Sequence, residues 1–105
     1  MPLIGFTVMK SEILNGQKRQ TIRKLRKHPI KVGDTLYLYW HLRRKDCQLL
    51  KIAKCTEEFV KPWAMLRDSW DVATRDGFKN PSEMQEWFMK KHNPDADTLF
   101  QVIRW

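Results

Sequence analysis

Cysteine, glycine and proline are scarce in this sequence, and long apolar runs are missing. The 105 residues include two Cys, four Gly and five Pro. Two cysteines are too few for the disulfide framework of a small secreted domain, and so little Gly and Pro excludes collagen-like and low-complexity chains. No apolar run approaches the roughly 20 residues of a transmembrane helix, and no signal peptide is recognisable. We therefore expect a cytoplasmic protein with reduced thiols and no membrane contact.

The chain contains enough apolar material for one folded domain. Hydrophobic residues make up 42% of the sequence and aromatic residues 11%, which argues against global disorder. A chain of 105 residues corresponds to one domain, and neither a linker nor an internal repeat divides it. We therefore expect residues 1–105 to form a single, monomeric domain.

Acidic residues are few relative to basic ones. Twenty Lys and Arg stand against twelve Asp and Glu, which gives a formal net charge of +8. This excess favours a polyanionic partner, with nucleic acid ahead of an anionic membrane because no segment forms a clean basic amphipathic helix. The alternative is a basic protein that is merely soluble.

Hydrophobic patterning predicts an α+β fold. Strands are expected over residues 3–7, around Thr21, over 35–40, as one long strand over 47–60, and over 99–105. Helices are expected over residues 9–15, 62–73 and 81–92. This order, with its consecutive central strands, favours a small mixed β barrel or sheet flanked by helices.

The clearest helix signal begins at Asn80. This residue is suited to the N-cap, Pro81 to the first helical position, and Glu83 stands three residues past the cap. The apolar stripe of this helix includes Trp87. We expect Trp87, and Trp70 on the preceding helix, to pack in the core.

A basic run follows the first helix. Seven basic residues lie within eleven positions, with no acid among them: Lys18, Arg19, Arg23, Lys24, Arg26, Lys27 and His28. Clustered cations attract phosphates and release counterions, although a solvated loop would have the same composition. On a strand, Thr21 and Arg23 share one face, so part of the run can face a cleft.

Tyr37 and Tyr39 are candidates for stacking on nucleobases. After a Gly-Asp turn signal they alternate with Leu36, Leu38 and Trp40, which predicts a strand with two distinct faces. Exposed aromatic rings on such a strand can stack against the unpaired bases of RNA.

Metal and phosphate-loop motifs are missing. The histidines are scattered, and the spacing of Cys47 and Cys55 matches no zinc pattern. Gly16 and Gly33 stand alone, so the chain has no glycine-rich phosphate loop. We expect neither a metal nor a cofactor.

Lys18 and Thr21 are a candidate pair for nucleophilic chemistry. A lysine that is crowded by Arg19 and Arg23 and partly buried has its charged form disfavoured. Its neutral amine could then take a proton from the threonine hydroxyl. The spacing Lys-x-x-Thr occurs by chance in many chains, so it carries little weight alone.

Residues 13–23, Ile-Leu-Asn-Gly-Gln-Lys-Arg-Gln-Thr-Ile-Arg, resemble the signature of the ASCH domain. That signature is a helix ending in Gly, then Lys, then Thr-x-Arg. Residues 31–34 resemble the family's entry into its next strand, and residues 76–78 its later helical pair. Residues 100–105 resemble its last strand. The match covers most of the chain in the right order.

The resemblance implies a PUA-like fold, a small pseudo-barrel with helices flanking a cleft. ASCH domains are proposed to bind RNA or modified nucleosides. Small bacterial members hydrolyse 4-acetylcytidine, and another branch cleaves single-stranded RNA. By position, Lys18 matches the catalytic lysine, Thr21 the nucleophile and Arg23 the cleft arginine. The family's glutamate should precede Gly77, where this chain has Asp76, which is shorter by one methylene.

Three functions therefore stay open. The first is binding of RNA or a modified nucleoside through Lys18, Arg19, Arg23, Lys24, Arg26 and Lys27, with Tyr37 and Tyr39. The second is an amidohydrolase in which Lys18 activates Thr21 and Asp76 shuttles or orients the proton. The third is cleavage of single-stranded RNA in the same cleft, where Lys18 or Arg23 stabilises phosphorane charge. The excess of positive charge fits polymeric RNA better than a free nucleoside.

Overall fold

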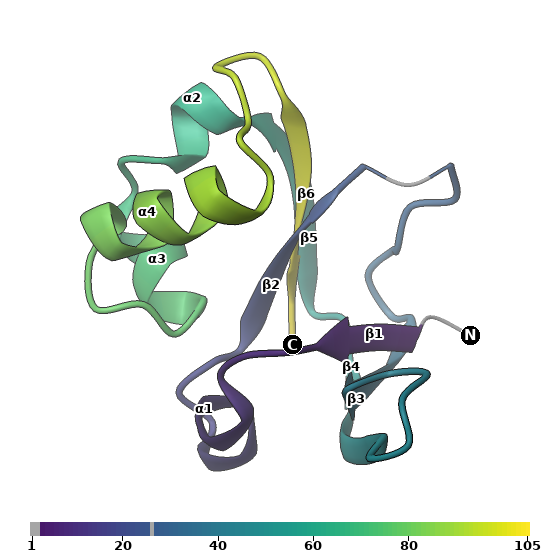
Figure 1. The fold of residues 1–105 in the computed structure, drawn as a ribbon. Helices are drawn as coiled ribbons and strands as arrows, with labels where there is room; N and C mark the ends of the chain where they lie inside the picture. Colours follow the sequence, from purple (N-terminus) through teal and green to yellow (C-terminus); the bar gives the residue numbers. More distant parts are fainter. Residues whose placement is uncertain (1–2, 26) are drawn as a thin grey trace.

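Six strands and four helices make up the part of the chain that the computed structural model describes, residues 3–25 and 27–105 (Figure 1). The strands are β1 (Leu3–Phe6), β2 (Gln20–Lys24), β3 (Thr35–Trp40), β4 (Gln48–Lys54), β5 (Glu57–Pro62) and β6 (Leu99–Arg104). The helices are α1 (Lys10–Asn15), α2 (Trp63–Leu66), α3 (Trp70–Arg75) and α4 (Pro81–Lys91). This α+β composition confirms the expected fold class.

The strands form two three-stranded sheets. One has the order β1-β3-β4 and is mixed, because β1 runs parallel to β3 while β3 and β4 are antiparallel. The other has the order β2-β6-β5 and is antiparallel throughout. Figure 1 shows α2, α3 and α4 grouped beside the second sheet, away from β1, β3 and β4.

Strand β6 contributes to both hydrophobic cores. Phe100 and Val102 pack among the residues that α2, α3 and α4 bury, whereas Ile103, and Trp105 directly after the strand, pack against the first sheet. Successive side chains of a strand point to opposite faces, so one strand can supply both clusters. The four side chains are at most 7% exposed, which confirms the expected buried strand at the end of the sequence.

Residues 47–60 form two strands in different sheets, so the expected single long strand was wrong. At the break, the Cys55 amide donates to the Asp34 carbonyl at 2.9 Å, and the Thr56 amide donates to the Arg104 carbonyl at 2.9 Å. The chain thus leaves the first sheet at Cys55 and enters the second at Thr56. Both residue types are acceptable in strands, so the local sequence carries no sign of the switch.

The expected helix over residues 62–73 is also wrong, because it is split into α2 and α3. Ser69 starts α3 afresh, and its hydroxyl oxygen accepts a hydrogen bond from the Val72 amide at 3.2 Å. The break resets the helical phase that related Trp63 to Trp70. Trp63 is buried. Trp70 is 64% exposed, so the expectation that it packs in the core was wrong.

Candidate functional site

A cavity of about 370 Å³ lies between β1, β2, the turn after α3, and α4. We call it the Lys18 pocket. Aromatic rings line part of it: Phe6, Phe78, Trp87 and Phe88. Cationic side chains line another part: Lys18, Arg23, Lys24 and Lys91. Among the lining residues that the structure describes, Asp76 is the one acid.

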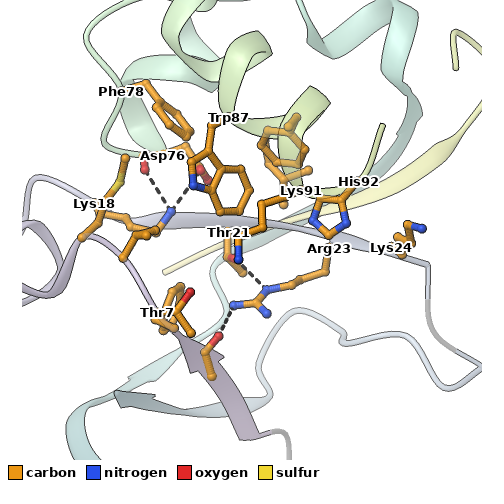
Figure 2. A pocket seen from close by; sticks show the side chains of 16 residues that line it. Thr7, Lys18, Thr21, Arg23, Lys24, Asp76, Phe78, Trp87, Lys91 and His92 are labelled. Carbon is orange, nitrogen blue, oxygen red and sulfur yellow. Dashed lines mark hydrogen bonds and ion pairs between the residues drawn. The ribbon is translucent and has the colours of Figure 1, made fainter. Parts of the chain in front are cut away.

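Lys18 is buried against Asp76, as Figure 2 shows. Its ammonium Nζ lies 3.0 Å from the carboxylate Oδ2 and donates to the Asp76 main-chain carbonyl at 2.9 Å. The two side chains are 5% and 7% exposed. Burial lowers the pKa of Lys18, the Asp76 carboxylate opposes that shift, and the nearby Arg23 charge adds to it.

Two glycines in the left-handed region bring Lys18 and Asp76 together. Gly16 ends α1 with φ 88°, a conformation that costs glycine little and turns the chain toward β2. Gly77 follows Asp76 with φ 95°. A Cβ atom at Gly77 would lie 2.7 Å from the sulfur of the flexible Met9 side chain, which would have to shift, so it is chiefly the positive φ that favours glycine here.

A chain of buried polar contacts holds the other oxygen of Asp76. The Gln20 side-chain amide donates to Asp76 Oδ1 at 3.3 Å, and its own oxygen accepts from Arg104 Nε at 2.9 Å. The remaining guanidinium nitrogens of Arg104 donate to Glu57 and Asp71, both at 2.9 Å. Arg104 thereby fixes the orientation of the Gln20 amide, and that amide fixes the Asp76 carboxylate.

Thr21 and Arg23 share one face of β2, as a strand requires. Arg23 Nε donates to the Thr21 hydroxyl oxygen at 2.9 Å, and another guanidinium nitrogen donates to the Gly5 carbonyl at 2.6 Å. The Arg23 guanidinium lies over the Phe6 ring, 5.0 Å from its centroid. Because the Thr21 hydroxyl accepts from Arg23, its own proton remains available for donation to another group.

The pocket gathers five of the residues singled out in the sequence: Lys18, Thr21, Arg23, Lys24 and Asp76. The rest of the basic run is placed elsewhere. Arg19 and Lys27 are exposed and do not line the pocket, and Arg26 lies outside the described residues. The structure thus divides the basic run between a pocket wall and the open surface.

Tyr37 and Tyr39 do not line the Lys18 pocket. They lie half-buried on β3, while Leu36 and Leu38, which alternate with them, are fully buried. The alternation expected for this strand is therefore present. A base that stacks on either tyrosine would therefore bind outside the Lys18 pocket.

Trp87 packs against the core as expected and also lines the pocket, while two further pocket residues on or beside α4, Lys91 and His92, were not singled out. Lys91 and His92 follow the buried Phe88 by three and four positions, so a helical wheel places them on the same side. Partial burial lowers the pKa of His92, and the charges of Lys24, Arg23 and Lys91 lower it further. The sequence did contain a signal for these residues: Lys91 and His92 extend, with polar side chains, the same face of α4 that buries Phe88.

Among residues 3–25 and 27–105, no group of three or more His, Cys, Asp or Glu side chains is placed to hold a metal ion. Cys47 and Cys55 are both free thiols. None of the described helices combines the length and the apolar character needed to cross a membrane.

Two small sheets, flanking helices and a pocket between them define an α+β domain. No protein-family model and no curated protein matches the chain. Its fold is similar to a crystal structure of the ASCH domain from Lactobacillus crispatus, with a TM-score of 0.66 over 98% of this chain and 77% of that chain. Sequence identity is 14%, so the similarity concerns the fold. The chain has an ASCH-like fold, as its sequence signature led us to expect.

Proposed function

We propose that the protein binds RNA and that the Lys18 pocket receives one nucleoside unit of the strand. The observation that carries this proposal is the joint occurrence of aromatic rings and cations on the walls of one pocket. Trp87, which is half-buried at the pocket wall, offers a ring against which a base can stack, while Arg23, Lys24 and Lys91 offer positive charge to the backbone. Stacking surfaces combined with cations are the usual means of binding single-stranded nucleic acid.

The size and charge of the pocket support a single unit of RNA as its occupant. Its volume of about 370 Å³ lies at the lower end of the range for ligand pockets, which is roughly 300–1,000 Å³. That space suits one base and its sugar. The charge of Asp76 is already matched by Lys18 at 3.0 Å, so the remaining cations leave the pocket positive. The ASCH-like fold supports the same assignment, since the sequence resemblance implies RNA or modified nucleosides as ligands.

Amide hydrolysis of a modified cytidine is the second candidate, favoured because Lys18, Thr21 and Asp76 line one pocket. In this reaction the Thr21 hydroxyl oxygen attacks the acyl carbon, the amine leaves with a proton, and an acyl ester of Thr21 forms. Water then hydrolyses the ester, which restores Thr21 and releases the carboxylic acid. Lys18 would accept the hydroxyl proton, and the lowered pKa of this lysine supports that role.

One parallel experiment tests both candidates. The full chain is titrated against a fluorescently labelled single-stranded RNA at low salt, and separately incubated with 4-acetylcytidine while acetate release is followed. We expect RNA binding. Absence of RNA binding at low salt would refute the first proposal, and acetate release would establish the second. Shortening of the labelled RNA during the titration would instead identify the cleavage activity that the sequence resemblance also allows.

A further inference from the structure

Three nitrogen-bearing side chains lie around Arg23 in one part of the Lys18 pocket. Lys24 ends β2, Lys91 ends α4, and His92 follows it. In Figure 2 the His92 ring lies over Arg23, with Lys24 on one side and Lys91 extending toward Thr21 on the other. Their charges act on one another, because Lys24, Arg23 and Lys91 each disfavour protonation of His92. Two elements far apart in the sequence thus contribute like charges to one pocket.

No carboxylate neutralises this part of the pocket. Among the described residues, none forms an ion pair with Lys24 or Lys91, whereas the neighbouring Lys90 pairs with Glu86 at 3.9 Å. Like charges held close together without a counterion repel, and an anion between them relieves that repulsion. The C-terminal end of α4 opposes an anion, but it carries only about half an elementary charge. The two lysines outweigh it.

Opposite charge lies on the other side of Trp87. An adjoining hollow of about 270 Å³ shares Trp87 and Phe78 with the Lys18 pocket and is lined by Glu83, Glu86 and Lys90. Lys90 pairs with Glu86 at 3.9 Å, so Glu83 leaves this hollow with an excess of one negative charge, which disfavours a phosphate there. The polarity of the two hollows therefore gives a bound nucleotide one favoured orientation, with its phosphate toward Lys91 and away from Glu83.

We propose that Lys24, Lys91 and His92 form a phosphate subsite, so that the ligand of the Lys18 pocket carries a phosphate rather than being a free nucleoside. The inference rests on the proposed RNA binding and adds to it the position and chemistry of one backbone contact. The base lies against the aromatic wall while its phosphate lies between the two lysines. His92 gains a proton more readily when the phosphate is present, because the anion favours the imidazolium form.

The first experiment tests the phosphate subsite with inorganic phosphate. The imidazole resonances of the full chain are followed by NMR over roughly pH 5 to 8, in sodium phosphate and in sodium chloride of equal ionic strength. We expect phosphate to raise the pKa of His92 relative to its value in chloride. The shift should shrink in Lys91→Gln and persist in Lys90→Gln, because Lys90 lies outside the Lys18 pocket. No shift at His92, or equal shifts in the two variants, would overturn the subsite.

The second experiment compares cytidine with its 5′- and 3′-monophosphates. We expect at least one monophosphate to bind about tenfold more tightly than cytidine, as one charge-assisted contact would give. Lys91→Gln should abolish that gain. Lys90→Gln is the matched control, because it removes the same charge from the adjacent helix position but lies outside the Lys18 pocket, and it should preserve the gain.

The two proposals fail in different ways. If labelled RNA binds equally well to the Lys90→Gln and Lys91→Gln variants and phosphate does not change the pKa of His92, the phosphate subsite is wrong. The proposed RNA binding then still stands. If phosphate raises the pKa of His92 but no RNA binds, the proposed RNA binding is wrong. The three side chains then form an anion site whose ligand is not RNA.

Discussion

Asp76 holds Lys18 through both its side chain and its main chain. The ammonium lies 3.0 Å from the Asp76 carboxylate and 2.9 Å from the Asp76 carbonyl. The carbonyl contact depends on the turn at Gly77 rather than on the carboxylate. The carboxylate favours the charged form of Lys18, whereas burial, the larger effect, disfavours it.

A double-mutant cycle on Lys18 and Asp76 should show strong coupling in stability. Lys18→Met leaves a buried carboxylate without its cation, and we expect a loss of about 3 kcal/mol in the free energy of unfolding. Asp76→Asn keeps an amide oxygen for Gln20 and should be less damaging. The double variant should lose clearly less than the two single losses added together, measured by denaturant unfolding.

Lys90→Met provides the surface control for this cycle. Lys90 is 78% exposed, and its pairing with Glu86 should contribute little. Strict additivity of the Lys18 and Asp76 losses would contradict the ion pair as a unit of stability.

Short-range signals predicted much of the fold from the sequence. The cap at Asn80 is an example, since its side-chain oxygen accepts from the Glu83 amide at 2.8 Å as the spacing required. The glycine that ends α1 is another. The switch between sheets at Cys55 was not predictable, because it depends on the distant Asp34 and Arg104 carbonyls.

The candidate site was predictable only in part, for the same reason. The family signature marked Lys18, Thr21 and Asp76, and the structure places all three on one pocket. The link from Asp76 through Gln20 to Arg104 joins positions 56 and 84 residues apart in sequence, which no local pattern reveals.

The lowered pKa of Lys18 should appear in the pH dependence of stability. Between this lowered pKa and the ordinary value of 10.5, the unfolded chain binds more protons at Lys18 than the folded chain does. The unfolding free energy therefore rises with pH across that window. We expect the stability of the natural protein, relative to Lys18→Met, to increase from neutral pH toward pH 10. If the relative stability instead falls over this range, the effect of Asp76 on the pKa of Lys18 is larger than the opposing effect of burial.

Thr21→Ala should separate catalysis from binding. If 4-acetylcytidine is hydrolysed, removal of the hydroxyl should abolish acetate release because no other atom of this side chain can attack the acyl carbon. RNA affinity should change little, since a hydroxyl neutralises no phosphate. Thr21→Ser keeps the nucleophile and should retain activity. Equal loss of activity and affinity in Thr21→Ala would assign Thr21 a structural role.

RNA binding should weaken steeply with salt. If about four phosphates are neutralised, a plot of log K against log salt for a single strand has a slope near −3. Lys91→Gln should make that slope shallower by about 0.7, the contribution of one phosphate contact. Fluorescence anisotropy at several sodium chloride concentrations measures both slopes. A flat response would indicate that binding, if present, does not involve the basic surface.

Trp87 should contribute stacking energy to RNA binding, whereas Trp70 should not. Trp87 lines the Lys18 pocket, and Trp70 is 64% exposed outside it. Trp87→Leu removes the ring and should cost about 1–3 kcal/mol of binding, roughly a fivefold to 150-fold loss of affinity. Trp70→Leu removes the same ring from the surface and should leave affinity unchanged in the same anisotropy titration.

Trp87 also packs against Phe78 and Phe88, with ring centroids 6.2 Å and 5.0 Å away, so its loss can disturb the fold. Trp87→Phe addresses this, because it keeps an aromatic ring in the core with a smaller surface for a base. Its affinity should fall between those of the natural protein and Trp87→Leu, at a temperature where circular dichroism shows all variants folded. If Trp87→Leu stays folded and binds RNA as tightly as Trp70→Leu does, the base does not stack on Trp87 and the aromatic wall serves only the core.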